Sequence, residues 1–156
     1  MNVNDLAAFM EDEGILGDIV FLDDETPTVE AAAAAVGVQP EQIGKSLLFL
    51  TPDEPILVIA CGTTRVSYKR LAQYLGINRK KLKLAKAAEV LTVTGYRVGT
   101  VPPFGHRRPL STLIESDVIN QDDLYAGGGE INALVHLSTA ELCRVTGAEI
   151  VNLHDS

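Results

Sequence analysis

The segment from residue 95 to residue 105 constrains the fold more than any other part of the sequence. Three glycines and two prolines fall within these eleven positions. Proline has no N–H group for a helix or a sheet, and glycine loses more conformational entropy than other residues when its backbone is fixed. The sequence therefore predicts a long irregular loop here, with regular elements before and after it.

Apolar periodicity and helix caps predict five helices. Thr26 followed by Pro27 has the pattern of an N-cap with proline at the first helical position. Ser138, with Glu141 three residues later, has the pattern of a capping box. The expected helices span residues 3–10, 27–36, 66–75, 85–92 and 139–146.

Short apolar runs between turn residues predict seven strands. The runs 43–50 and 56–61 flank a short turn and should form a hairpin. Because strands outnumber helices and lack regular βα alternation, we expect an α+β fold with a mixed, barrel-like sheet flanked by helices. An open, doubly wound α/β sheet is the alternative. The other expected strands span residues 19–22, 110–114, 124–126, 133–137 and 149–153, and the basic stretch 78–84 runs toward a further strand.

Length and composition indicate one globular domain. The chain has 156 residues, of which 46% are apolar and 22% charged, so residues 1–156 are expected to form a single domain. No apolar run approaches the roughly 20 residues that span a bilayer, and the N-terminus lacks the basic residues of a signal peptide. We therefore expect a cytoplasmic protein. Cys61 and Cys143 are far apart and predict two buried thiols rather than a disulfide framework or a zinc site.

The net charge of −8 is distributed unevenly along the chain. Residues 1–44 carry ten acidic and no basic side chains, residues 45–108 carry twelve basic and three acidic ones, and residues 109–156 carry eight acidic and one basic. A basic segment in an acidic protein is expected where an anionic partner such as a nucleic acid approaches one face. A solvated basic surface would give the same pattern, so charge alone leaves both interpretations open.

Lys45 is the first candidate for chemistry. It lies between Gly44 and Ser46 at the start of an apolar strand, and a glycine there allows a ligand or another backbone to come close. The alternative is an ordinary strand lysine on a solvated face. A P-loop is excluded because Gln39, not glycine, lies five residues before Gly44.

Two glycine-rich segments are the other candidates. In the loop of residues 95–105, glycines expose backbone N–H groups and prolines stiffen the chain, a combination suited to holding an ester or an oxyanion. A plain connecting loop is the alternative. Residues 127–129 are three consecutive glycines, which provide bare backbone either for binding or for a tight turn.

The three histidines lack the spacing of a metal site. His106 adjoins the glycine- and proline-rich loop, His136 lies in an expected strand, and His154 is near the C-terminus. His136 is a candidate proton shuttle, although a structural histidine is the commoner case. We expect no bound metal.

The sequence resembles the YbaK/ProX family of aminoacyl-tRNA editing domains, which is related to the insertion domain of bacterial prolyl-tRNA synthetases. The resemblance covers most of the chain. Lys45 together with the loop 99–103 is its most specific part, and the three glycines support it. The matching segments are residues 36–49, 95–105, 125–129 and 142–148.

The resemblance implies a trans-editing deacylase that hydrolyses the ester bond of a mischarged tRNA without a metal or organic cofactor. It implies that Lys45 is the key functional residue. The position of His136 differs between family branches with different amino-acid preferences, so cysteine, alanine and serine esters all remain open. A non-catalytic tRNA-binding or regulatory module of the same fold is the alternative. The implied substrate-binding residues are Ser46, Gly99, Thr100, Val101, Pro102, Pro103, Gly127, Gly128, Gly129 and His136.

Mischarged tRNA is the expected partner, with an aminoacyl-tRNA synthetase as a further candidate, and neither a membrane nor DNA is expected. Lys and Arg side chains recognise phosphate, so a dense group of them predicts the tRNA contact. Five cations fall within the eight positions 79–86, too many for one side of a short strand. The expected tRNA-binding residues are Arg79, Lys80, Lys81 and Lys83. Lys86 is the fifth cation of the group.

Overall fold

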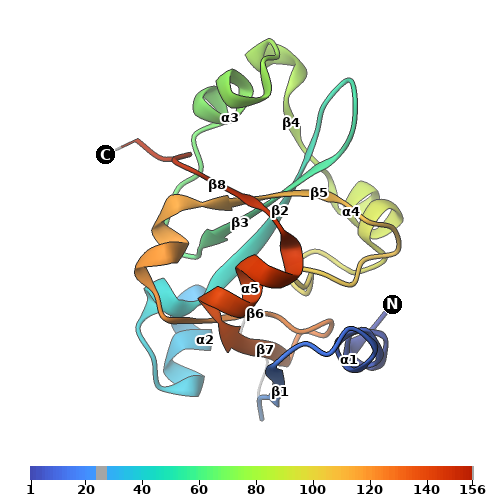
Figure 1. The fold of residues 1–156 in the computed structure, drawn as a ribbon, viewed down its shortest axis with the longest axis vertical. Helices are drawn as coiled ribbons and strands as arrows, with labels where there is room; N and C mark the ends of the chain where they lie inside the picture. The colour runs from blue at the N-terminus through green and yellow to red at the C-terminus, as the bar shows by residue number, and fades with distance from the viewer. Residues whose placement is uncertain (24–27, 156) are drawn as a thin grey trace.

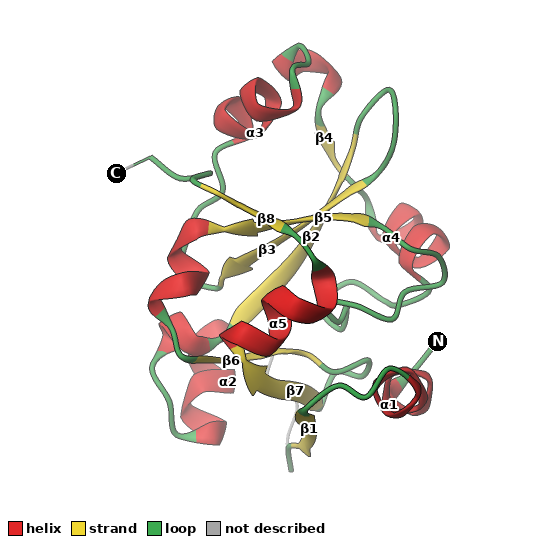
Figure 2. Ribbon diagram, in the orientation of Figure 1, coloured by secondary structure: helices red, strands yellow, loops and turns green. Residues whose placement is uncertain are grey.

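The computed structural model describes residues 1–23 and 28–155 (Figure 1). These residues combine helices and strands in an α+β arrangement (Figure 2). The α-helices are α1 (Val3–Asp12), α2 (Val29–Val36), α3 (Tyr68–Leu75), α4 (Ala87–Thr94) and α5 (Thr139–Thr146). The strands are β1 (Gly17–Phe21), β2 (Gly44–Leu50), β3 (Ile56–Cys61), β4 (Lys83–Leu84), β5 (Ser111–Glu115), β6 (Asp123–Gly127), β7 (Ala133–Ser138) and β8 (Glu149–Val151). Three short 3-10 helices are η1 (Pro40–Gln42), η2 (Arg79–Lys81) and η3 (Ser116–Asn120).

The strands form two sheets. In the first, β7 lies between β1 and β6 and is antiparallel to both. The second has the order β4-β2-β3-β5-β8, with antiparallel pairing from β4 to β3 and parallel pairing from β3 to β8. The predicted mixed α+β fold and the predicted β2–β3 hairpin are confirmed. The sheets stay open rather than closing into a barrel, and the antiparallel pairings do not fit the doubly wound alternative.

The beginning of β2 lies where the two sheets meet. An isolated parallel bridge joins Ile43, just before β2, to Tyr125 in β6. Figure 1 shows the three-stranded sheet at one end of the molecule and α3 at the other, with the five-stranded sheet between them. The first residues of β2, including Lys45, are therefore placed at a junction rather than on an open sheet face.

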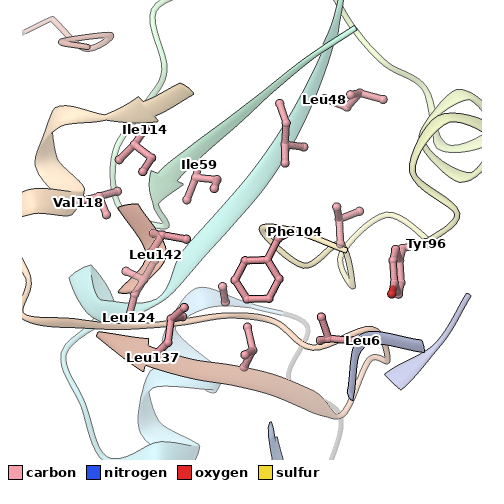
Figure 3. Close-up of a cluster of buried hydrophobic side chains, with 14 of the residues drawn as sticks. Leu6, Leu48, Ile59, Tyr96, Phe104, Ile114, Val118, Leu124, Leu137 and Leu142 are labelled. Atoms are coloured by element: carbon pink, nitrogen blue, oxygen red, sulfur yellow. The ribbon is translucent and has the colours of Figure 1, made fainter. Parts of the chain in front are cut away.

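The two faces of the β2–β3 hairpin are covered by different hydrophobic clusters, because side chains alternate along a strand. On one face the largest cluster joins the sheets to α1 and α5, and Figure 3 shows Leu6, Leu124 and Leu142 within it. On the other face, Phe49 and Leu71 belong to a cluster beneath α3. Each cluster fixes one side of the strand that carries Lys45.

The loop of residues 95–105 is irregular, as predicted, but it is packed rather than free. Tyr96 and Phe104 are buried in the larger cluster (Figure 3). Phe104 stacks on Phe9 of α1 with ring centroids 5.9 Å apart. Burial of these two aromatic side chains anchors both ends of the loop and holds the residues between them in place.

At the start of α5 the capping prediction is confirmed only in part. Ser138 caps α5 by accepting the N–H of Glu141 at 3.0 Å. The Glu141 carboxylate does not accept the N–H of Ser138, as a capping box requires. It accepts the N–H of Leu16 at 2.7 Å and pairs with Arg144. Glu141 thus ties α5 to the segment before β1, a contact that the capping-box prediction missed.

The second helix begins at Val29, after Thr28, whose side chain accepts the N–H of Ala31 at 3.0 Å. The predicted cap at Thr26 and Pro27 lies outside the described residues. Cys61 is buried and Cys143 half-buried, and both are free thiols. Among the described residues, no helix is both long enough and apolar enough to cross a bilayer.

Candidate active site

Lys45 is held by the turn that follows β3. It pairs with Ala60 across the hairpin, and its side chain extends along the sheet toward residues 62–64. The Lys45 Nζ donates to the carbonyl oxygen of Thr64 at 2.7 Å and, more weakly, to that of Gly62 at 3.4 Å. Both acceptors are neutral. The predicted strand lysine is therefore half-buried and oriented, not a free side chain on a solvated face.

The charge of Lys45 is not neutralised within the described structure. Burial lowers the pKa of Lys45, and the neighbouring Cys61 offsets part of this effect. None of the described carboxylates forms a salt bridge with it. An ammonium group has three N–H donors, and the two carbonyls engage two of them. One donor and a positive charge are thus available to an anionic or carbonyl ligand.

A cavity of about 300 Å³ lies beside Lys45, between α2, the start of β2, the loop and the β6–β7 hairpin. Its walls are mainly apolar, with side chains such as Ala32, Ile43 and Leu134. The cavity brings together five residues that the sequence predicted to share a site, although they come from three distant segments. These residues are Lys45, Ser46, Gly99, Val101 and Gly127.

Glycine is required where the loop meets β6. A Cβ atom on Gly127 would lie 2.3 Å from the carbonyl oxygen of Val101, closer than any real contact. Gly99 has a φ of +85°, which favours glycine, and nothing lies within 4 Å of the position that a Cβ atom would take there. Gly127 therefore lets the loop close one wall of the cavity, while Gly99 turns the loop at its rim.

Ser46 contributes a polar group at the cavity wall. Its Oγ is buried and finds no hydrogen-bond partner among the residues that the structure describes. A buried hydroxyl without a partner is costly. Because Ser46 also lines the cavity, its Oγ is available to a polar group of a bound ligand.

The other predicted loop and glycine residues support the cavity from outside. Gly129 donates its N–H to the carbonyl of Thr100 at 2.9 Å, and Gly128 donates to that of Ala133 at 3.0 Å. Pro102 and Pro103 are buried, and the carbonyl of Pro102 lies 2.7 Å from His106 Nε2. None of Thr100, Pro102, Pro103, Gly128 and Gly129 is among the described residues that line the cavity.

His136 is also outside the cavity lining. Its ring stacks on Tyr125 with centroids 4.2 Å apart, and its Nε2 lies 2.5 Å from an Asp123 carboxylate oxygen. These contacts fix the imidazole on the three-stranded sheet. They match the structural interpretation of His136, and its role in catalysis or substrate binding stays a prediction.

A second hollow, of about 730 Å³, opens on the other side of Lys45. It lies against the start of α3, and its described lining includes three cations, Lys45, Arg65 and Arg79, and one acid, Asp155. Arg79 is placed by its guanidinium carbon, 4.7 Å from the centre of the Tyr68 ring. Lys45 is thus shared between an apolar cavity and a basic hollow.

Of the four predicted tRNA-binding residues, only Arg79 lines that hollow. Lys80 and Lys81 lie on η2 and Lys83 on β4, and all of them are exposed, as is Lys86. Exposure leaves their charges available to a partner. Their contact with tRNA stays a prediction.

Sequence reasoning missed a group of acidic residues behind Lys45. Thr64, whose carbonyl binds Lys45, donates its hydroxyl to an Asp117 carboxylate oxygen at 2.9 Å. Glu115, Asp117 and His154 lie close enough for their ligand atoms to surround a metal ion. The Glu115 oxygens, however, already accept the N–H groups of Asp117 and Leu153 and contact His154. The long sequence separations of these contacts left no local signal.

Comparison with known proteins identifies the family. A sequence model described as the aminoacyl-tRNA editing domain matches residues 23–145, which include Lys45, the loop and the three glycines. The chain belongs to the aminoacyl-tRNA editing domain family. The expected resemblance is thereby confirmed, and the matching region contains every residue that lines the cavity.

Relatives of this editing domain include free-standing and larger proteins. The uncharacterized protein YwhH of Bacillus subtilis (strain 168) is 28% identical over 134 residues, covering 85% of this chain and 83% of YwhH. A proline–tRNA ligase of Thermoanaerobacter sp. (strain X514) is 24% identical over 124 residues, 80% of this chain but 21% of that enzyme. The chain thus spans about a fifth of the ligase.

Solved structures share the whole fold. A protein crystallised as a candidate trans-editing enzyme for prolyl tRNA synthetase has a TM-score of 0.92 at 30% identity, covering 99% of this chain and 97% of that one. The hypothetical protein APE2540 has a TM-score of 0.88 at 28% identity, covering 97% of this chain and 99% of that one.

Proposed function

We propose that this editing domain is a trans-editing deacylase, which hydrolyses the ester bond between a wrongly attached amino acid and the 3′ end of a tRNA. The observation that carries the proposal is the position of Lys45, which lines both the apolar cavity and the basic hollow. The cavity has the size and lining for a small aminoacyl group. The hollow has the charge for terminal phosphates.

In the proposed reaction, water adds to the ester carbonyl, and the negative charge that forms on its oxygen is stabilised by Lys45. The bond to the ribose oxygen then breaks, that oxygen takes a proton, and free amino acid and uncharged tRNA leave. Because Lys45 is held by two neutral carbonyls, it needs little reorganisation when the charge develops. Each of these steps uses only water, the substrate and side chains of this chain.

The cavity suits a substrate with a small side chain, such as an alanine, serine or cysteine ester. The Ser46 Oγ favours a polar side chain, and the apolar wall favours an apolar one. The similarity to part of proline–tRNA ligases supports a synthetase as a further partner.

The direct test is to incubate the purified protein with tRNAs that carry alanine, serine or cysteine and to measure the remaining ester. The proposal predicts rapid loss of at least one ester. Binding of charged tRNA without any ester loss would instead support the alternative, a non-catalytic tRNA-binding module.

A further inference from the structure

The turn that holds Lys45 is itself held by a residue from a distant part of the chain. Residues 62–64 follow β3 and belong to neither sheet, so strand pairing does not fix their carbonyl groups. The Thr64 N–H bonds the carbonyl of Cys61 at 3.0 Å, which closes the turn. The Thr64 hydroxyl donates to Asp117 Oδ2 at 2.9 Å, across 53 positions of sequence.

We propose that Asp117 is a positioning residue for Lys45 and acts through Thr64. The carboxylate of Asp117 fixes the side chain of Thr64, and the carbonyl of the same threonine receives the Lys45 ammonium group at 2.7 Å. Thr64 is buried, so its hydroxyl has no ready replacement partner in water. This inference rests on the proposed function and adds two residues that act on the site through Lys45.

Asp117 is well suited to this role because it is held rigidly. Its own N–H donates to Glu115 Oε1 at 2.8 Å, and Glu115 is completely buried. The other Glu115 oxygen accepts the N–H of Leu153 at 2.7 Å and contacts His154 Nδ1 at 2.9 Å. The C-terminal segment and the end of β5 therefore hold Asp117, which in turn holds Thr64.

The charge of Asp117 also reaches this part of the site. Burial raises the pKa of Cys61 to about 11, and Asp117 and Glu115 contribute to the same rise. Cys61 adjoins the turn and pairs with Gly44, next to Lys45. The negative charge of Asp117 thus acts on Cys61, a neighbour of Lys45, while the Lys45 ammonium group has no direct carboxylate partner among the described residues.

The test combines kinetics with a measurement on Lys45 itself. Thr64→Val removes the hydroxyl at nearly constant volume, Thr64→Ser keeps it, and Asp117→Asn removes the charge. Thr112→Val is the matched control, because the Thr112 hydroxyl bonds the carbonyl of Leu110 on the strand side away from Lys45. The pKa of Lys45 is followed by NMR of its side chain, and kcat and KM are measured with the preferred charged tRNA.

We expect Thr64→Val to lower both kcat, roughly tenfold, and the pKa of Lys45, with KM little changed. Asp117→Asn should shift both quantities in the same direction, whereas Thr64→Ser and Thr112→Val should resemble the wild type. An unchanged pKa of Lys45 in folded Asp117→Asn and Thr64→Val would overturn the inference. The pKa of Lys45 can be measured in an inactive protein. A wild type that hydrolyses no ester would therefore contradict the proposed function, and an unchanged Lys45 pKa in the variants would contradict the inference.

Discussion

The ammonium nitrogen of Lys45 lies 2.7 Å from the main-chain carbonyl oxygen of Thr64 and forms no salt bridge with a described carboxylate. A lysine held in this way keeps its charge for a ligand. Neutral acceptors orient the group, and burial lowers its pKa. This combination separates a functional lysine from one in a structural ion pair.

Gly127→Ala is expected to disrupt the packing of the loop on β6. The new Cβ would lie 2.3 Å from the carbonyl oxygen of Val101, so the loop must move. We expect a decrease of about 1–3 kcal/mol in the free energy of unfolding, together with loss of deacylation. Gly37→Ala, at an open position with φ of +74°, is the control and should lose stability but retain kcat. Full activity of Gly127→Ala would show that the cavity does not depend on this packing.

The pair of Glu115 and His154 predicts a pH window of maximal stability. Burial raises the pKa of Glu115, but hydrogen bonds from the N–H groups of Asp117 and Leu153 and from His154 outweigh burial and lower it. The hydrogen bond to Glu115 raises the pKa of His154. The stability that the folded state gains from protonated His154 is fully present below about pH 6.5, and it is lost as the pH rises through the raised pKa of His154. The stability that the folded state gains from ionised Glu115 is fully present above about pH 4.3, and it is lost as the pH falls through the lowered pKa of Glu115.

His154→Ala should therefore reduce the free energy of unfolding by about 1 kcal/mol near pH 5.5 and by much less near pH 9. Urea unfolding at both pH values measures the difference. An equal reduction at the two values would mean that packing, rather than charge, accounts for the contribution of His154.

Chelation should leave activity intact. Glu115, Asp117 and His154 have the arrangement of a metal site, yet both Glu115 oxygens already accept hydrogen bonds. The proposed steps use Lys45 and water. Deacylation measured before and after exhaustive EDTA treatment should agree, with a zinc-supplemented sample as the control. Loss of activity that zinc restores would contradict the mechanism.

Much of the site could be predicted from local sequence. Gly44-Lys45-Ser46, the loop with its prolines and the glycines at 127–129 each carry a recognisable pattern, and the cavity brings parts of all three together. Helix starts such as Ser138 were also predictable, because a cap acts over three or four residues.

Contacts between distant residues could not be predicted. The Thr64–Asp117 bond and the Ile43–Tyr125 bridge depend on how the two sheets meet, and neither spacing nor composition encodes this. For the same reason the sequence suggested a barrel-like sheet, whereas the strands form two open sheets.

Binding of tRNA should be weak, sensitive to salt and dependent on the basic segment. Removing one phosphate-binding cation should reduce the slope of log affinity against log salt by about 0.7 for a single strand. Lys80→Glu combined with Lys81→Glu should weaken binding of charged tRNA and make this slope shallower. Arg108→Glu, an exposed charge reversal outside the dense group of cations at residues 79–86, is the control. Identical salt titrations of the double variant and the wild type would place the tRNA elsewhere.

Deacylation by Lys45→Ala is the decisive measurement. Lys69→Ala, which removes an exposed cation on α3, is the control for removal of a positive charge. With the preferred charged tRNA in single-turnover conditions, and with folding verified by circular dichroism, we predict a rate about 100- to 1,000-fold below wild type for Lys45→Ala, the decrease typical of one oxyanion donor. Lys69→Ala should remain near the wild-type rate. A folded Lys45→Ala that hydrolyses the ester within about twofold of the wild-type rate would contradict the role assigned to Lys45.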